Sequence, residues 1–242
     1  MNYLKLRLMR SFKPLNRAFW KIRPSLVSSP LICGAWQSFC EKGRLTLPAL
    51  QEDFLHRLAL EEVIIPGTRD PGHGQDAPLA DLLCLLQLAQ ALRPKRLLEV
   101  GTYRAKTTYA FHRNLPGTEI VSYDIMRVDS PYRSYLESHS DISLRIEDFS
   151  RSEDLRNEAP FDFIFIDAGH RYKEVLDDSA KCFEVLSPHG CIVWHDYRIN
   201  EFLNPGLEVP EALGEISQRF PIYSIPGTTC AIYSQNPSIL AK

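Results

Sequence analysis

Along most of this chain, short apolar runs of strand length take turns with segments in which apolar residues recur at helical spacing. This pattern predicts a series of strands and helices. Short apolar runs of strand length lie at residues 97–100, 119–124, 142–146, 161–167 and 191–195. Segments with helical spacing lie before, between and after them, at 79–92, 104–114, 131–139, 150–157, 171–186 and 209–219. The run from Phe161 to Asp167 is apolar on both faces, as a central parallel strand is. This order predicts a doubly wound α/β sheet.

The end of the chain predicts a hairpin on that sheet. Two last strands are expected at 221–225 and 228–234, and only Pro226 and Gly227 separate them. So short a connection joins antiparallel strands. We therefore expect a core domain of residues 76–242 with a seven-stranded, mostly parallel sheet and an antiparallel last strand. Ser187–Gly190 is expected to be a turn before strand 191–195.

Residues 1–75 precede the regular pattern and predict a basic, helical appendage. Residues 1–40 contain seven Lys or Arg and no Asp or Glu. Apolar residues share one side of a helix there, namely Leu4, Leu8, Phe12, Leu15 and Phe19. Pro14 predicts a kink or two short helices. This segment fits either contact with an anionic membrane surface or packing against its own domain or a second subunit of a homo-oligomer. A helix is expected at 52–62, and the loop around residues 60–75 is either a lid over a site or a linker.

Composition places the chain among ordinary globular proteins. It has 242 residues, 44% hydrophobic and 24% charged, with a net charge of −2. This balance gives no case for nucleic acid as a partner. Six cysteines are scattered without a CxxC pair, which favours reduced thiols in a cytoplasm. No apolar run approaches the roughly 20 residues of a membrane-spanning helix, so we expect a cytoplasmic protein, peripheral at a membrane if residues 1–40 bind one.

The segment after the first strand carries the most informative chemistry. Strand 97–100 ends on Gly101, and a helix-forming segment follows at once. A strand, tight turn and helix in this order open nucleotide-type sites in α/β folds. The loop lacks the G-x-G-x-x-G pattern of dinucleotide sites. Glu99 before the glycine suits a ligand with a positive end and hydroxyl groups better than a pyrophosphate.

Acidic residues lie at the carboxyl ends of nearly all the predicted parallel strands. They are Glu99, Asp124, Asp148, Asp167 and Asp196. Ligands of open α/β sheets bind beyond the carboxyl ends of the strands, so these side chains are expected to converge on one site. A single carboxylate at such a place is also explained by capping of the following helix. Five at one edge favour a binding site.

These motifs resemble those of the class I S-adenosylmethionine-dependent methyltransferases. The resemblance rests on Leu98–Thr102, Tyr123–Asp124, Ile146–Asp148 and Phe165–His170, and on the terminal hairpin. Phe161–Tyr172 and Leu186–Tyr197 resemble a subgroup in which a D-x-x-H-x-Y segment precedes an H-D-Y segment. That subgroup includes small-molecule O-methyltransferases, among them enzymes acting on sugar hydroxyls. The resemblance covers about residues 78–234.

The resemblance implies a Rossmann-like fold and a site for S-adenosylmethionine. Glu99 and the backbone of Gly101, with Thr102 and Tyr103 beside them, would hold the aminoacyl part of the cofactor. Asp124 would accept hydrogen bonds from the ribose hydroxyls. Asp148 would face the adenine amino group, Phe149 is either a stacking wall or a core residue, and Asp167 would border the cofactor.

Asp167, His195 and Asp196 are a candidate set of metal ligands. Carboxylate ligands favour Mg²⁺ or Mn²⁺, although an imidazole also admits other transition metals. Consecutive residues on a strand point to opposite faces, so His195 and Asp196 ligate one ion only if the strand has ended. Otherwise Asp196 caps a turn and His195 lies in the core. His170 is a candidate general base, because a neutral imidazole accepts a proton near pH 7. A surface or capping histidine is the alternative.

The sequence therefore predicts an O-methyltransferase that acts on a hydroxyl of a small molecule, glycan or glycolipid. Its catalytic residues would be His170 and Asp167, with a divalent metal. The alternatives are an oxidoreductase linked to NAD or a nucleotide sugar, and a non-catalytic partner protein with a methyltransferase fold. One departure from the family pattern concerns Ala105, where members usually have glycine.

Overall fold

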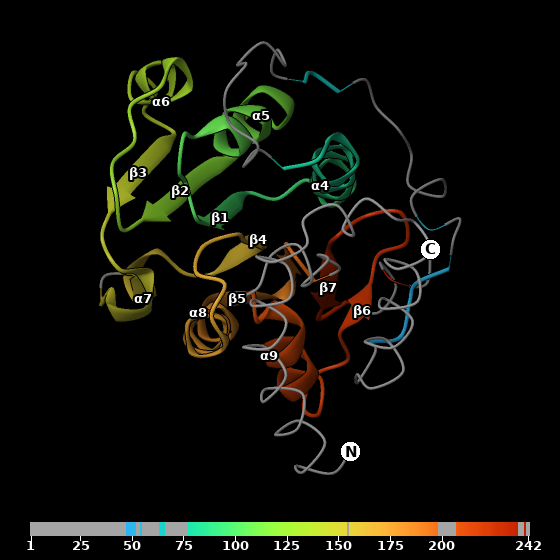
Figure 1. Cartoon of the computed structure of the whole chain (residues 1–242). Helices are drawn as coiled ribbons and strands as arrows, with labels where there is room; N and C mark the ends of the chain where they lie inside the picture. The colour runs from blue at the N-terminus through green and yellow to red at the C-terminus, as the bar shows by residue number, and fades with distance from the viewer. Residues whose placement is uncertain are drawn as a thin grey trace, which may run out of the picture.

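A seven-stranded sheet forms the centre of the protein (Figure 1). The structure is a computed structural model that describes residues 47–51, 54, 63–65, 77–153, 155–197, 207–236 and 240. The strands are β1 (Arg96–Val100), β2 (Glu119–Asp124), β3 (Ile142–Ile146), β4 (Phe161–Ile166), β5 (Leu186–Trp194), β6 (Tyr223–Ser224) and β7 (Ala231–Ser234). Their order is β3-β2-β1-β4-β5-β7-β6, and only β7 is antiparallel to its neighbours. The predicted α/β sheet with an antiparallel last strand is confirmed.

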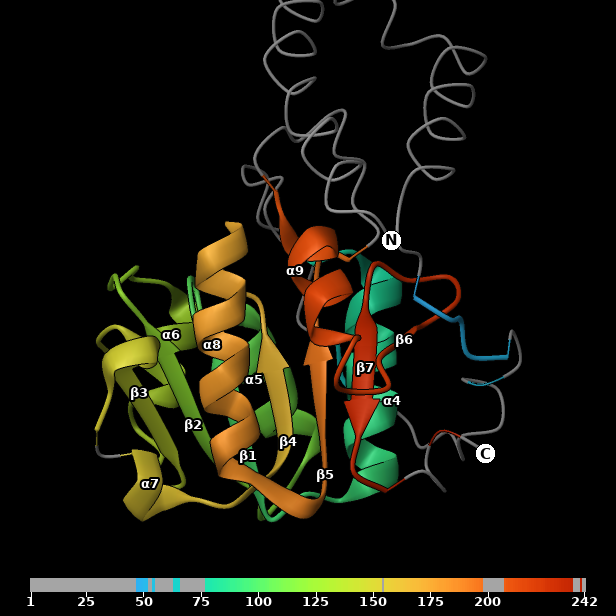
Figure 2. The ribbon, with the colours of Figure 1, turned by 90° about the horizontal axis from the view of Figure 1, so that it is seen from below.

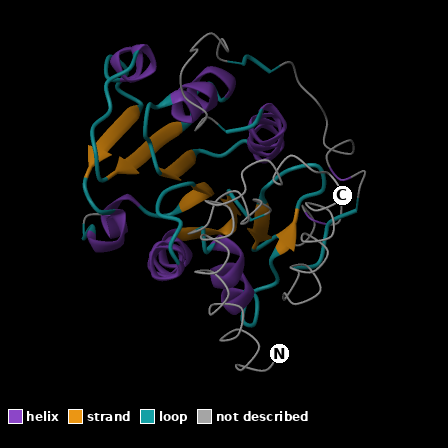
Figure 3. Ribbon diagram, in the orientation of Figure 1, coloured by secondary structure: helices purple, strands orange, loops and turns teal. Residues whose placement is uncertain are grey.

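Helices cover both faces of this sheet (Figures 1 and 3). They are α4 (Leu79–Leu92), α5 (Lys106–Asn114), α6 (Pro131–Leu136), α7 (Leu155–Glu158), α8 (Tyr172–Val185) and α9 (Val209–Ile216), with a short 3₁₀ helix η2 at Phe149–Arg151. One apolar core lies under α4 and α5, and a second lies under α8 and α9. Adjacent strand residues serve opposite cores, as Leu97 and Leu98 of β1 do. Figure 2 shows α8 and α9 crossing one face of the sheet.

Most predicted elements occur where the apolar pattern places them. β2 and β3 and helix α4 have the expected bounds, whereas α6, α9, β6 and β7 are shorter. The helix expected at 150–157 is divided into η2 and α7, because the chain is extended at Ser152, with φ −62° and ψ 125°. Cys84, Cys182, Cys191 and Cys230 are buried free thiols, as expected, and Cys33 and Cys40 lie outside the described residues.

The turn predicted at Ser187–Gly190 is wrong, because these residues belong to β5. Phe161 of β4 pairs with Leu186, and Phe163 pairs with Cys191. Four residues of β5 therefore stand opposite a single residue of β4, so the strand bulges outward there. A Cβ atom on Gly190 would lie 3.0 Å from the Phe161 carbonyl oxygen, so the glycine permits this close approach. Pro188 and Gly190 correctly indicated an irregularity. This irregularity interrupts the pairing of β5 with β4 but does not end β5.

Several residues before the core domain contact it. Leu50 N donates to Ser224 O (3.0 Å), and Ser224 N donates to Pro48 O (2.8 Å), along the edge strand β6. Phe54 is fully buried against the core under α4. Most of the predicted appendage, its amphipathic helix and the helix at 52–62 lie outside the described residues. The boundary at residue 75 stays a prediction.

The predicted lid is described only in part. Ile64 N donates to Asn114 Oδ1 (2.6 Å), and Asn114 Nδ2 donates to Ile64 O (2.7 Å), at the carboxyl end of α5. Residues 66–76 lie outside the described part of the chain. Among the residues that are described, no helix has both the length and the apolar character needed to cross a membrane.

Candidate functional site

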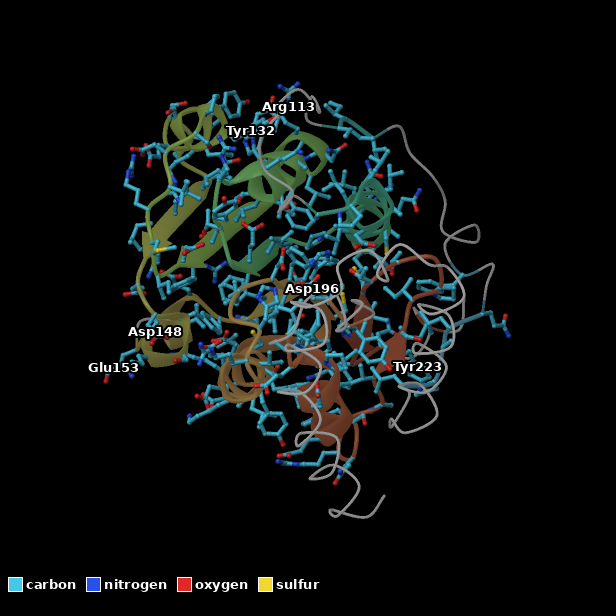
Figure 4. All side chains as sticks on the ribbon, in the orientation of Figure 1. Arg113, Tyr132, Asp148, Glu153, Asp196 and Tyr223 are labelled. Atoms are coloured by element: carbon cyan, nitrogen blue, oxygen red, sulfur yellow. The ribbon has the colours of Figure 1, made fainter. Side chains whose placement is uncertain are left out.

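A large cavity lies at the carboxyl ends of the parallel strands. Its volume is about 1730 Å³. A site for one small ligand has roughly 300–1,000 Å³, so this cavity has room for two. Its lining includes the predicted residues Gly101, Thr102, Tyr103, Asp124, Asp148, Phe149, Asp167, His170, His195 and Asp196. Among the described side chains that Figure 4 labels, Asp196 lies near the middle of the molecule and Asp148 beside α7.

Gly101 forms the turn at the end of β1 because no other residue fits there. Its φ is +107°, and a Cβ atom on it would lie 2.1 Å from the carbonyl oxygen of Asp167. Asp167 N donates to Val100 O (2.7 Å), which holds the ends of β1 and β4 together. The glycine therefore permits contact between two strand ends, in addition to any approach of a ligand.

The turn into α5 has two further residues with left-handed backbone. Tyr103 has a φ of +43° and Ala105 has a φ of +61°. Ala105 is fully buried and caps α5. Left-handed backbone costs an L-residue roughly 1–2 kcal/mol, so this is where a glycine would fit with less strain. The alanine is accommodated in this turn.

Asp124 is held at the end of β2 by two backbone groups. Tyr103 N donates to its Oδ2 (2.6 Å), and Met126 N donates to its Oδ1 (2.9 Å). Both carboxylate oxygens are fixed, and each retains capacity for a second donor. The side chain lines the cavity.

Glu99 lies beneath the turn and not in the cavity lining. It is fully buried, and its Oε2 accepts from Thr108 Oγ1 and from Ser122 Oγ (2.5 Å). Burial raises its pKa to about 8, although these hydrogen bonds act in the opposite direction. Its other oxygen, Oε1, has no hydrogen-bond partner among the described residues. A buried acceptor without a donor is costly, so this atom is suited to a donor from a ligand.

Asp148 and Phe149 lie at the β3 end of the cavity. Asp148 caps η2, since its Oδ1 accepts from Ser150 N (3.1 Å) and Ser150 Oγ (2.7 Å). Phe149 is 4% exposed and packs against Tyr123, with ring centroids 5.3 Å apart. Phe149 thus belongs to the core and also reaches the cavity wall, and the residue types alone had not separated these two roles.

Two carboxylates and two imidazoles gather where β4 and β5 end. The ligand atoms of Asp167, His170 and Asp196 lie within 4.8 Å of one another. His170 Nε2 is 2.7 Å from Asp196 Oδ2 and 3.7 Å from Asp167 Oδ1. His195 Nδ1 is 2.9 Å from Asp196 Oδ1 and 3.2 Å from Asp167 Oδ1. β5 ends at Trp194 and Asp196 has a φ of +62°, so the strand has ended and both His195 and Asp196 reach Asp167.

The four groups shift one another's protonation. Burial favours neutral His170, but Asp167 and Asp196 outweigh it and raise the His170 pKa to about 9. The same balance raises the pKa of His195 well above its usual range. Burial opposes the charge on Asp167 and Asp196 as well, yet the two imidazoles hold both carboxyl pKa values below normal. In the absence of other cations, the cluster is therefore a network of opposite charges.

A fifth member of this network was missed by the sequence reasoning. Asp81 lies in the first turn of α4 and is 1% exposed. Its Oδ2 lies 3.0 Å from His195 Nε2, and its Oδ1 accepts from Thr229 N (3.0 Å). The available signal was an acidic residue inside an apolar helix, a position that is buried only when the charge has a partner.

Comparisons with known proteins agree with this architecture. Residues 82–197 match a family model described as a methyltransferase domain. The SAH-bound methyltransferase PaMTH1 of Podospora anserina is 16% identical, with a TM-score of 0.55, over 85% of this chain and 96% of that one. No curated protein sequence matches significantly.

Two further solved structures are similar in fold. The O-methyltransferase TomG of Streptomyces achromogenes, in complex with SAM, is 16% identical, with a TM-score of 0.53 over 67% of this chain and 82% of that one. CalS11, a TDP-rhamnose 3′-O-methyltransferase, is 16% identical, with a TM-score of 0.51 over 64% of this chain and 79% of that one. At these identities the similarity establishes the fold.

Proposed function

Because residues 82–197 match a methyltransferase domain model and the fold resembles that of O-methyltransferases, we propose that the protein is a class I S-adenosylmethionine-dependent methyltransferase that methylates a hydroxyl group with assistance from a divalent metal. The observation that carries the proposal is the cluster of Asp167, His170 and Asp196 at one side of a cavity large enough for two ligands. The remainder of the cavity, along the ends of β1, β2 and β3, would hold S-adenosylmethionine.

The cofactor site is proposed from the residues that line or underlie this part of the cavity. Asp124 would accept hydrogen bonds from the ribose hydroxyls through the two oxygens that backbone amides already orient. Asp148 and Phe149 would border the adenine. The Oε1 atom of Glu99, which lacks a partner among the described residues, would accept from the ammonium group. The backbone of Gly101, Thr102 and Tyr103 would surround the aminoacyl end.

The metal site is proposed from the carboxylates at the other side. Asp167 and Asp196 offer hard oxygen ligands, and His195 Nδ1 lies within 3.2 Å of both. This set fits Mg²⁺ or Mn²⁺. A bound divalent cation would supply Lewis acidity and lower the pKa of an acceptor hydroxyl.

His170 is the proposed general base. Its side chain is 32% exposed and lines the cavity, so an acceptor hydroxyl has access to it. Asp196, 2.7 Å away, orients the imidazole. Methyl transfer is an in-line displacement, and much of the acceleration would come from holding the sulfonium and the acceptor oxygen in line. A cation bound to Asp167 and Asp196 would offset the charges that raise the His170 pKa to about 9, so that the imidazole could accept the proton that the oxygen loses.

The acceptor class is proposed as a small molecule or a glycan. CalS11 methylates a sugar nucleotide and TomG is an O-methyltransferase of tomaymycin synthesis, and both have a similar fold. The basic segment 1–40 would also suit a glycolipid at a membrane surface. That segment lies outside the described residues, so peripheral membrane contact and a homo-oligomer rest on the sequence alone.

Calorimetry and a methyl-transfer assay test the proposal together. The full chain should bind S-adenosylmethionine, and NAD should show no binding at the same concentration. Methyl transfer from labelled cofactor should then be measured against panels of sugar nucleotides and phenols, with and without Mg²⁺. Binding of NAD in place of S-adenosylmethionine would favour the oxidoreductase alternative and reject the proposal.

A further inference from the structure

Asp81 is a buried acid that precedes the segment matching the methyltransferase domain, and Thr229, which donates to it, follows that segment. That segment spans residues 82–197, whereas Asp81 precedes it and Thr229 lies in the connection between β6 and β7. Thr229 donates to Asp81 twice, from N to Oδ1 (3.0 Å) and from Oγ1 to Oδ2 (2.6 Å). Among the described residues, the Asp81 carboxylate also contacts Nε2 of His195, 3.0 Å from Oδ2.

These contacts favour Nε2 of His195 as the nitrogen that carries the proton when a cation is bound to Asp167 and Asp196 on the other side of the ring. A backbone N–H can only donate, so Oδ1 of Asp81 is an acceptor. Its Oδ2 accepts the Thr229 hydroxyl and faces Nε2 of the ring. A neutral imidazole beside a carboxylate is protonated on the nitrogen that faces it, which leaves the lone pair on the other nitrogen. Both ring nitrogens of His195 face carboxylates, Nε2 facing Asp81 and Nδ1 facing Asp167 and Asp196. With a cation on Asp167 and Asp196, the proton of the ring stays on Nε2 beside Asp81, and the lone pair is on Nδ1.

Nδ1 of His195 is placed among the carboxylates of the candidate metal site. It lies 2.9 Å from Asp196 Oδ1 and 3.2 Å from Asp167 Oδ1. It nevertheless has no hydrogen-bond partner in the described part of the chain. Two ligand atoms at right angles on an ion with bonds of about 2.1 Å lie about 3 Å apart. The two distances from Nδ1 are thus those expected between ligands around a common ion.

We propose that Asp81 is a positioning residue that holds His195 with Nδ1 toward Asp167 and Asp196, so that His195 completes the metal site. The inference rests on the metal-assisted function proposed above. The proposal gives the two imidazoles different roles: His195 is a metal ligand and His170 is the general base. His195 is 8% exposed and braced from behind by Asp81, whereas His170 is 32% exposed, lines the cavity and stays available to the acceptor.

The variant Asp81→Asn tests the proposal because it preserves shape and changes the proton. The amide oxygen must face the Thr229 N–H, so the amide nitrogen would face His195 and donate to Nε2. The proton of the neutral ring then moves to Nδ1, which can no longer ligate. Replacing a group that orients a metal ligand reduces metal affinity about 10–100-fold. We expect that loss for Mn²⁺, measured by electron paramagnetic resonance on the full chain, with S-adenosylmethionine affinity changed less than about twofold.

Thr229→Val is the matched control. It removes the hydroxyl that donates to Asp81 but leaves the contact between Asp81 and His195. Its Mn²⁺ affinity should stay within about threefold of the wild type. A folded Asp81→Asn protein with wild-type Mn²⁺ affinity would overturn the proposal, and so would an equal loss in both variants.

A measurement on the wild type covers the case in which Asp81→Asn does not fold. In the Mg²⁺-saturated protein, ¹⁵N-histidine NMR should show His195 protonated on Nε2 and unprotonated on Nδ1. Protonation of Nδ1, or a His195 spectrum that Mg²⁺ leaves unchanged, overturns the proposal. If the wild type binds no Mn²⁺ but still transfers methyl groups, this inference and the metal assistance fail, and the methyltransferase assignment stands.

Discussion

Gly101 and Asp167 meet backbone to backbone where β1 and β4 end, at a distance that leaves no room for a side chain on Gly101. The Gly101 Cβ position lies 2.1 Å from the Asp167 carbonyl oxygen, and backbone cannot move aside as a flexible side chain can. The cofactor turn and the candidate metal site are therefore joined by direct contact. A change in one strand end shifts the other.

Gly101→Ala should accordingly be strongly destabilising. The added methyl group overlaps a carbonyl oxygen, and a φ of +107° lies outside the regions open to alanine. We expect a loss of about 3 kcal/mol in the free energy of unfolding, measured by urea denaturation. Ala105→Gly is the matched control, because relief of left-handed strain offsets the loss of one buried methyl group. A Gly101→Ala protein as stable as the wild type would show that the two strand ends are further apart.

Asp124→Asn should weaken cofactor binding. Both Asp124 oxygens accept from backbone amides, so an amide nitrogen in place of either oxygen faces another donor and also cannot accept from the ribose. Hydrogen bonds to a charged group contribute roughly 1.5–3 kcal/mol, which corresponds to a Kd for S-adenosylmethionine about 10–100-fold higher by calorimetry. Asp129→Asn is the control, because this side chain is in the same loop and 81% exposed. Equal Kd values for both variants would remove Asp124 from the cofactor site.

His170→Gln should slow turnover without weakening cofactor binding. A positioned general base contributes about 10²–10⁴-fold, so kcat should fall by that factor while the Kd for S-adenosylmethionine stays unchanged. His189→Gln, a change at an exposed position in the β5 bulge, is the control for His170→Gln and should behave as the wild type.

Removal of the metal should stop turnover. Asp167→Ala and treatment with EDTA should each abolish metal-dependent turnover. Full activity in EDTA would reject metal assistance. The role of His170 would then still be decided by the His170→Gln variant.

Local patterns predicted most of the fold because strands and helices here bury continuous apolar faces. β2 and β3 have the predicted bounds, and β6 and β7 pair antiparallel as predicted, although their connection spans residues 225–230 and not only Pro226 and Gly227. The β5 bulge was not predicted. A proline and a glycine within four residues signal a turn, and only the pairing of Phe161 and Phe163 with the partner strand keeps those residues in the sheet.

The candidate site was predictable to the extent that its residues follow strand ends. Asp124, Asp148, Asp167 and Asp196 reach one cavity because parallel strands end at one edge. Contacts between segments that are distant in the sequence could not be predicted from the local pattern. Asp81 and His195 are 114 residues apart, and nothing near either residue indicates the other. The burial of Glu99 depends on Ser122 and Thr108 from two other elements.

Asp178→Asn should stabilise the protein at neutral and alkaline pH. Asp178 is 8% exposed, and burial, with the nearby charges of Asp148 and Asp177, raises its pKa to about 7. The folded state thus holds this proton more tightly than the unfolded state, whose pKa is 3.8. Its contribution to stability is present below about pH 4 and is lost as the pH rises toward 7. The variant should exceed the wild type by about 4 kcal/mol at pH 8 and match it at pH 4, because one pKa unit corresponds to about 1.4 kcal/mol.

Urea denaturation of the cofactor-free protein at both pH values measures this difference. The comparison at pH 4 serves as the internal control, since a change in packing at residue 178 would alter stability equally at both values. A wild-type protein that gains stability from pH 4 to pH 8 relative to the variant would contradict the sign of the shift.

Glu99 should release a proton when the cofactor binds. Its pKa of about 8 leaves it mostly protonated at pH 7 in the empty site. An ammonium group near its unpartnered Oε1 favours the carboxylate, so binding lowers the pKa and expels the proton. Calorimetry at pH 7 in buffers of different ionisation enthalpy should therefore give binding enthalpies that differ between buffers, corresponding to nearly one proton released. Glu99→Gln should abolish the buffer dependence while retaining the contacts of Thr108 and Ser122. Equal enthalpies in all buffers for the wild type would mean that Glu99 supports the turn from below and makes no contact with the cofactor.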